Sequence, residues 1–423
     1  MIFASALCAS GMWLYLQRVV IPHQVREAAI HGRPRGNLSD LYPRWLGSRE
    51  LLLRGRDPYS IEVTREIQAG YYGRPLDPAR PDDPRDEQRF AYPVYVAFLL
   101  APTVRLPFET IRPFFFGILM LLTICSVPLW LRVIRWAPPW WVQISLSLFT
   151  LGSPAVMQGL KLQQLSLLVA AMILAAVLLL RSGHLSAAGT LLALSTIKPQ
   201  VVWLLLVWLT VWTASDWKRR YRLLVSFLVT MTILLVSSEI YLPHWIQRFW
   251  EAVEEYRKYT GASSVLSTMI SPVVGVSVAI LSLAMTALIC WKERKRLAGS
   301  EAFARVLCVV LAVTVLVAPT AAVYNEIFLL PSILLLARDW RHIARRSASG
   351  TFLIGSIATL AAWPWITSIV IAGLSFVTGP EVAQRFWTVP FWTVWLNPMA
   401  VAAPMLIVAY RGTASPTPER ATA

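Results

Sequence analysis

Long apolar runs separated by short polar segments dominate the pattern along this chain. A helix that crosses a bilayer needs about 20 apolar residues, and the run at 2–21 has this length. It lacks the basic leader and the A-x-A site that are typical of a signal peptide, so we interpret it as a retained first span. Further spans are predicted near 110–131, 220–242, 265–290, 301–318, 323–337, 351–373 and 387–409.

The one long polar stretch, residues 22–90, contains 11 of the 23 acidic residues. The apolar segment 92–102 follows it, but this segment is too short to cross. We therefore expect a helix that lies on the outer leaflet. In 243–260, apolar residues recur at i, i+4, i+8 and i+11, which predicts a second, amphipathic helix at the interface.

Residues 185–212 allow two interpretations. As one broken span, they would carry the basic cluster at 216–222 to the outer side. As a hairpin that turns at Lys198-Pro199-Gln200, they have two short arms. Such arms leave the turn below the outer surface, where irregular backbone is tolerated only inside protein or beside a wet cavity. We prefer the hairpin, which gives about 12 spans and two cytoplasmic termini.

The composition narrows the class of protein. Of 423 residues, 56% are hydrophobic and 15% charged, which excludes a soluble enzyme and a disordered chain. The net charge of +16 would suit a nucleic-acid partner, but the basic residues gather in short clusters between apolar runs. That is the pattern of cytoplasmic loops. We therefore predict an all-α polytopic membrane protein without nucleic acid, whose four cysteines are packing thiols.

The chain is expected to form one integral membrane domain, 1–423. The first span occupies 1–21, the outer loop with its interfacial helices 22–109, the remaining spans 110–410, and a cytoplasmic tail 411–423. No ATP-binding cassette is legible.

Asp40 is the first candidate for chemistry. Ser39 fits an N-cap, and Gly55 fits the end of the helix that follows. Asp40 would then stand at a helix N-terminus on the outer face. A carboxylate there is either a partner of the helix dipole and nothing more or a reactive group. Asp57, before a proline, fits a turn.

Lysine is rare, and Lys161 and Lys198 each stand alone at the outer end of an apolar run. Snorkelling to the interface would explain either one, but an ionisable group at membrane depth is also a functional candidate. Together with Gln163, Gln164 and Gln200, the two lysines would suit an anion such as a lipid phosphate.

A late outer turn contains Asn325 and Glu326, for which helix capping is the alternative explanation. The histidines His184, His244 and His342 have no partners at the spacing of metal ligands.

Several of these segments, in this order, resemble glycosyltransferase family 87. This family contains polyprenol-phosphate-mannose-dependent mannosyltransferases of the GT-C superfamily. The similar blocks are Asp40-x-Tyr42, Leu52-Leu53-x-Gly55-x-Asp57-Pro58-Tyr59, Tyr92-Pro93, Leu106-Pro107 and Lys198-Pro199. Two positions depart from the family pattern. Gln163-Gln164 stands in place of Gly-Gln, and Tyr324-Asn325-Glu326 in place of a late histidine.

The resemblance implies a GT-C fold and a catalytic base at Asp40. We expect a bacterial plasma-membrane enzyme that transfers a sugar, with mannose as the preferred candidate, from a polyprenyl-phosphate donor to a glycolipid or glycan acceptor. The reaction is expected at the outer face, with inversion. Lys198 and Lys161 would stabilise the phosphate. Binding of sugar or acceptor is expected from Tyr42, Gln163, Gln164, Asn325 and Glu326.

A divalent cation is compatible with this chemistry, but no second carboxylate is well placed to ligate it with Asp40, so no cofactor is predicted. A transporter or flippase of lipid-linked sugars is the alternative function, with the two lysines as substrate-path charges. Transporters often contain two halves with corresponding broken helices, whereas this sequence shows one candidate of this kind, the hairpin at 185–212. A non-catalytic membrane scaffold would leave the outward lysines unexplained.

Overall fold

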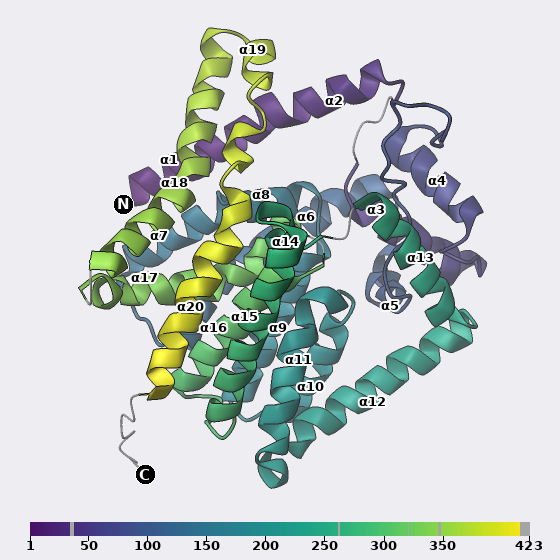
Figure 1. Cartoon of the computed structure of the whole chain (residues 1–423). Coiled ribbons are helices and arrows are strands. Elements are labelled where there is room, and N and C mark those ends of the chain that lie inside the picture. Colours follow the sequence, from purple (N-terminus) through teal and green to yellow (C-terminus); the bar gives the residue numbers. More distant parts are fainter. Residues whose placement is uncertain (34–37, 261–262, 320, 346–347, 415–423) are drawn as a thin grey trace.

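The computed structural model describes residues 1–33, 38–260, 263–319, 321–345 and 348–414. All regular elements of the described part are helices, which loops connect, and it contains no β-strand (Figure 1). The predicted all-α class is therefore confirmed. Residues 415–423 of the expected tail, and Arg346 of the last basic cluster, lie outside the described residues.

Six helical segments of the described chain are long and apolar enough to cross a membrane. They are Ile2–Ile30, Phe108–Val133 (α6), Trp217–Tyr241 (α12), Pro272–Glu293 (α15), Ile354–Val377 in α18 (Ala348–Val377), and Pro380–Arg411. The last contains α19 (Pro380–Gln384), η4 (Val389–Phe391), η5 (Val394–Leu396) and most of α20 (Asn397–Ala414). A seventh span would be the bent pair α8 (Pro154–Lys161) and α9 (Leu165–Arg181).

A polytopic membrane protein agrees with this count, but the expected number of about 12 spans is not confirmed. Several apolar helices fall short of about 20 residues. These are α7 (Trp140–Leu151), α10 (Leu185–Ser195), α11 (Pro199–Ala214) and α16 (Glu301–Val317).

The first helix does not end at Pro22, where the sequence suggested a boundary. Helix α1 (Ile2–Tyr15) continues through a π-helical turn, η1 (Leu16–Val20), into α2 (Ile21–Ile30). A proline clashes with the carbonyl four residues before it in a regular α-helix. The wider π turn directly before Pro22 accommodates the ring, so the helix continues into the segment assigned to the outer loop.

The outer loop folds into short helices that pack on one another. They are α3 (Leu41–Arg54), α4 (Ile61–Tyr72), α5 (Val96–Leu100) and η2 (Ala101–Thr103). Gly55 ends α3 with a left-handed φ of +64°, as predicted. Helix α5 is too short to cross, also as predicted, but Val96, Ala97 and Leu100 are buried in the protein core and do not lie on a lipid surface.

The hairpin interpretation of 185–212 agrees with the structure. Helix α10 ends at Ser195 and α11 begins at Pro199, and Lys198 in the turn contacts Ser166 at the start of α9. The other end of α11 contacts a basic loop, since Trp212 donates to the carbonyl of Arg296 (2.8 Å). The turn therefore lies at the opposite end of the bundle from the basic loops.

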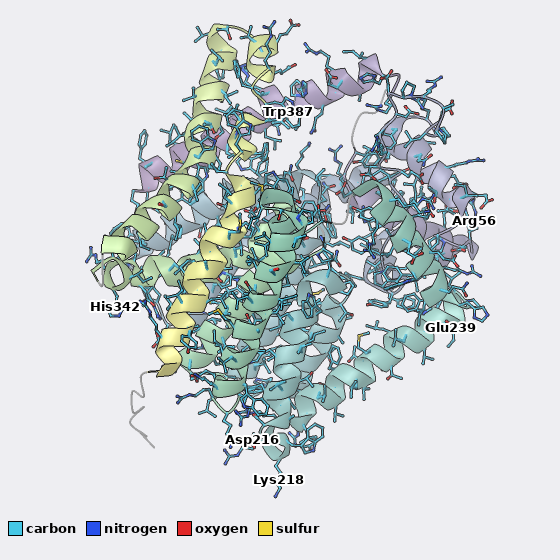
Figure 2. The ribbon with its side chains drawn as sticks, viewed as in Figure 1. Arg56, Asp216, Lys218, Glu239, His342 and Trp387 are labelled. Atoms are coloured by element: carbon cyan, nitrogen blue, oxygen red, sulfur yellow. The ribbon has the colours of Figure 1, made fainter. Side chains whose placement is uncertain are left out.

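The basic segments at 132–135, 181–184, 216–222 and 292–299 meet at one end of the molecule, the lower end in Figure 2, where Asp216 and Lys218 are labelled. Arg135 donates to the carbonyl of Gly299 (2.6 Å), and Arg181 to that of Val133 (2.6 Å). Helix α9 connects this end to the Lys198 turn, and its 17 residues correspond to about 25 Å.

Arg220 ties two of these loops together. Its buried guanidinium donates to the carbonyls of Arg294 (2.9 Å), Lys295 (3.1 Å) and Arg296 (3.2 Å). It also donates to the carbonyl of Trp212 (2.7 Å) and lies 3.9 Å from the ring centroid of that residue.

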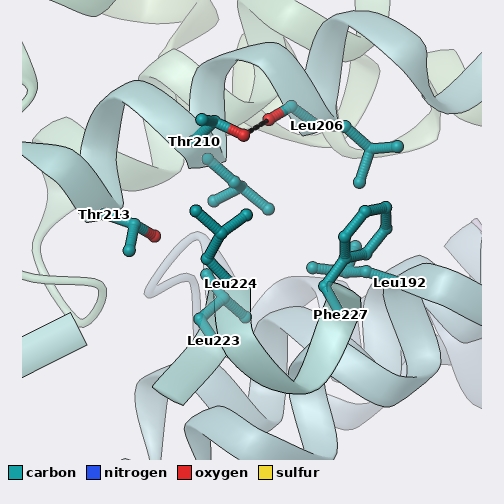
Figure 3. A pocket seen from close by; sticks show the side chains of 8 residues that line it. Leu192, Leu206, Thr210, Thr213, Leu223, Leu224 and Phe227 are labelled. Carbon is teal, nitrogen blue, oxygen red and sulfur yellow. Dashed lines mark hydrogen bonds between the residues drawn. The ribbon is translucent and has the colours of Figure 1, made fainter. Parts of the chain in front are cut away.

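Helix α12 leaves the bundle diagonally toward α13 (Trp245–Thr260) (Figure 1). Near its start, α12 meets α10 and α11 around a cavity of about 30 Å³, which Figure 3 shows. Its lining is apolar except for Thr210 and Thr213, and Thr210 donates to the carbonyl of Leu206 (2.8 Å). Such a small space is a packing defect rather than a ligand site. The amphipathic helix predicted at 243–260 is confirmed as α13.

The remaining helices form the centre and the far side of the bundle. They are α14 (Val265–Met269), η3 (Val323–Leu329) and α17 (Leu330–Arg345), together with α15, α16, α18 and α20. Helix α16 is apolar and buried nearly all round, as expected for a central helix. All four cysteines are free thiols, and Cys290 and Cys308 are buried.

We expect Arg220→Ala to lower the stability of the fold by about 2–4 kcal/mol, because it leaves buried carbonyls without a donor. The apparent melting temperature can be measured in detergent through the reaction of a thiol-specific dye with Cys290 and Cys308. Arg219→Ala, at an exposed neighbouring position, is the control and should change stability by less than about 0.5 kcal/mol. Equal melting temperatures for the two variants would contradict a clamping role for Arg220.

Candidate active site

The start of α3 meets the turn between α8 and α9. The backbone N–H of Asp40 donates to the carbonyl of Leu162 (2.9 Å), and the side-chain amide of Gln164 donates to the Asp40 carboxylate. Asp40, not Ser39, is the N-cap residue of α3, but its side chain makes no capping hydrogen bond. The carboxylate contacts Gln164 and the hydroxyl of Tyr71, 3.5 Å away. It is therefore engaged by other elements and not by its own helix.

A buried polar chain continues from Gln164 to the hairpin turn. The ammonium of Lys198 donates to the Gln164 side-chain carbonyl (3.5 Å) and to the hydroxyl of Ser166. Ser166 in turn donates to the side-chain oxygen of Asn325 (2.8 Å), and the Lys198 ammonium lies 4.5 Å from the ring centroid of Tyr324. The side chains of Gln164, Lys198 and Asn325 are each 2–3% exposed. One amide therefore contacts both the carboxylate and the buried cation.

Burial raises the pKa of Asp40 above its ordinary value. The charges of Arg44 and Lys198, the Gln164 hydrogen bond and the charge of Lys161 oppose this rise. A carboxylate whose pKa is raised accepts a proton more readily than an ordinary aspartate. This arrangement suits a general base.

Arg44 and several tyrosines complete the site. The sequence analysis did not single out Arg44 or Tyr71, and it named Tyr92 and Tyr324 only within the blocks of the family resemblance. Arg44 donates to the backbone carbonyl of Asp40 and lies 4.6 Å from the ring centroid of Tyr92. Arg44 follows Asp40 by four residues, and this helical spacing could have indicated it. Tyr71 comes from a distant segment and carries no such signal, whereas Tyr324 stood out only as a departure from the family pattern.

Tyr42 occupies a different place from the polar chain. Its ring centroid is 4.9 Å from that of Phe108 and 5.8 Å from that of Trp45. It lines an open pocket of about 370 Å³, formed by Leu38, Tyr42, Trp45, Arg49, Pro107, Phe108 and Glu109. A substrate contact of Tyr42 stays a prediction.

Lys161 and Glu326 also have other partners. Lys161 donates to the side chain of Gln24 in α2 and reaches Asp40 only through its charge. Glu326 accepts from the amide of Asn397 (3.0 Å), and burial raises the pKa of its carboxyl to about 8. Among the described residues, no three His, Cys, Asp or Glu side chains gather as metal ligands do.

Gln163 stands at the bend of 116° between α8 and α9. Its φ is +49°, in the left-handed region that favours glycine. A glycine adopts this backbone conformation without strain, which agrees with the glycine at this position in the family pattern. The Gln163 amide donates to the carbonyl of Arg112 (2.9 Å), while its side-chain oxygen is buried without a hydrogen-bond partner.

The comparisons with known proteins give one match. The family model of glycosyltransferase family 87 matches residues 90–319, more than half of the chain. Gln164 and Lys198 lie within the matched region, whereas Asp40 and Arg44 precede it. No curated protein and no solved structure matches the chain.

We expect Gln163→Gly to change stability by less than about 1 kcal/mol, because relief of the left-handed backbone offsets the lost hydrogen bond to Arg112. Gln163→Val should be markedly less stable, since a β-branched residue is strained at this φ. Melting temperatures of the two purified variants in detergent test this. A valine variant as stable as the glycine variant would show that the bend does not need its left-handed residue.

Proposed function

Because the chain belongs to glycosyltransferase family 87, we propose that it transfers a sugar from a polyprenyl-phosphate donor to an acceptor hydroxyl. Family membership makes it a membrane glycosyltransferase and favours transfer over transport. We further propose that the donor lipid is a polyprenyl phosphate, that the transferred sugar is mannose, that the reaction inverts the anomeric centre, and that the acceptor is a glycolipid or glycan.

One observation carries the proposal. The Gln164 amide contacts the Asp40 carboxylate through its nitrogen and the Lys198 ammonium through its oxygen. A base and a buried cation are thus held on either side of one side chain. Transfer from a phosphate ester requires this pair, a proton acceptor for the attacking hydroxyl and a positive charge for the leaving phosphate.

The reaction follows from these positions. Asp40 takes the proton of the acceptor hydroxyl, and the hydroxyl oxygen forms a bond with the anomeric carbon. The bond from that carbon to the phosphate oxygen breaks, and the polyprenyl phosphate leaves with the electron pair. Attack from the side opposite the leaving group inverts the anomeric centre. Phosphate needs no proton to leave, so the assignment requires no general acid.

We assign the basic end of the bundle to the cytoplasm on the positive-inside rule. The site, at the other end of α9, then faces outward, as the proposed reaction in a bacterial plasma membrane requires. Cytoplasmic termini stay a prediction.

Sugar and acceptor hydroxyls need hydrogen-bonding partners in this buried surrounding. The unpaired side-chain oxygen of Gln163 and the hydroxyls of Tyr71 and Tyr324 are our candidates. Asn325 holds Ser166 and so supports Lys198 indirectly. We propose a supporting role for Glu326 at the same turn.

Asp40→Asn should reduce transfer by about 10²–10⁴-fold, because the amide cannot accept the proton. The assay follows radiolabelled polyprenyl-phosphate mannose into a crude membrane-lipid acceptor pool, with the purified protein in lipid. Asp82→Asn, at an exposed position of the same outer loop, should keep full activity. Full activity of Asp40→Asn would show that Asp40 is not the general base. Movement of sugar-lipid across sealed vesicles without any transfer would support the flippase.

Transfer should rise with pH as Asp40 loses its proton. Since burial raises the pKa of Asp40, the acidic limb of the kcat/KM profile should lie above the pH at which ordinary aspartate titrates, about 4. Gln164→Met removes a hydrogen bond that stabilises the carboxylate, so the limb should move to still higher pH. A limb that stays in place in Gln164→Met would argue that another group controls the profile.

A further inference from the structure

Arg44 is a buried cation without a matching carboxylate. It stands on the first turn of α3, and its side chain is about as buried as a core residue, at 9% exposure. The guanidinium donates to the backbone carbonyl of Asp40 and lies over the ring of Tyr92. Among the described residues, no carboxylate lies within ion-pairing distance of Arg44. The side chain of Arg44 also donates a hydrogen bond to the Tyr92 hydroxyl. A guanidinium has five N–H donors, so these two hydrogen bonds do not use all of them.

Lys198 is a second buried basic residue, and burial together with the nearby charge of Arg44 lowers its pKa to about 7. A bound anion would raise this pKa and so favour the charged ammonium. The hydrogen bonds of Lys198 go to the neutral groups of Gln164 and Ser166. The charges of Arg44, Lys198 and Lys161 all act on Asp40, so one carboxylate faces more than one basic group. Uncompensated charge is costly in a buried site. The cluster therefore has room for one further negative charge.

We propose that Arg44 and Lys198 bind the phosphate of the donor together. This inference rests on the proposed function and adds Arg44 to the residues that contact substrate. A sugar phosphodiester carries one negative charge, and with Asp40 it balances the two cations. During transfer, Asp40 becomes neutral as it takes the proton, while the phosphate leaves as a monoester with nearly two negative charges. The charges of Arg44, Lys198, Asp40 and the phosphate therefore sum to near zero before and after transfer.

The geometry favours Arg44 over Lys161 for this role. Lys161 is engaged by Gln24 of the first helix, whereas Arg44 extends from the same helical turn as Asp40. A planar guanidinium can also bind two phosphate oxygens at once, which an ammonium does less well.

The experiment measures binding of polyprenyl phosphate, without sugar, to the purified full-length protein in lipid nanodiscs. Arg44→Gln keeps an amide for the Asp40 carbonyl and removes the charge, and we expect its Kd to rise about 10- to 100-fold. Arg44→Lys should recover part of the loss, and Lys198→Met should lose at least as much. Arg65→Gln, at an exposed position in α4, is the control and should bind as wild type does.

Two further probes identify the ligand group. Neutral polyprenol should bind wild type and Arg44→Gln equally, and inorganic phosphate should compete only weakly, because it lacks the lipid. Melting temperatures of all variants exclude a folding defect. Unchanged polyprenyl-phosphate affinity in a folded Arg44→Gln would overturn the role of Arg44 alone. If wild type itself does not prefer polyprenyl phosphate to polyprenol, the proposed function fails with it.

Discussion

The candidate site depends on one neutral amide between opposite charges in an apolar bundle. Gln164 donates to Asp40 and accepts from Lys198, so a carboxylate and an ammonium are held apart without forming a direct ion pair. A direct pair would satisfy both charges and leave neither available to a substrate. The amide instead positions both groups and leaves part of each charge uncompensated. The buried tyrosines and Arg44 are arranged around this unit.

The segments that carry Asp40, Gln164 and Lys198 meet at one end of the helix bundle. The bend after α8, the hairpin turn before α11 and the start of α3 converge there, while the basic loops meet at the other end of α9. Irregular backbone at depth is stable only where protein or water satisfies its polar groups. The short helices α10 and α11 are therefore a condition for the site, since longer ones would move the Lys198 turn out to the surface.

The site also joins two parts of the chain. The region that matches glycosyltransferase family 87 contributes Gln164 and Lys198, and the preceding segment contributes Asp40 and Arg44. The hydrogen bond between the Asp40 N–H and the Leu162 carbonyl connects them. Helix α13 packs over the outer loop from a third direction, through Trp245 against Tyr95 and an ion pair of Arg248 with Asp57 (2.6 Å). The position of Asp40, the base in our proposal, depends on all of this docking.

The sequence by itself determined those features that depend on neighbouring residues in the chain. Apolar periodicity specified the helical class and α13, and Gly55 specified the end of α3. Asp40 and Lys198 were candidates from the sequence, and the structure brings both into contact with Gln164. The tertiary structure decided what depends on distant partners. Lys161 contacts Gln24, Tyr42 packs on Phe108, and Arg44 lies over the ring of Tyr92. The same is true of Pro22, which a π turn accommodates within a continuous helix. Periodicity reports which face of a helix is buried, but hydrogen bonds between segments more than a hundred residues apart leave no pattern in a single sequence.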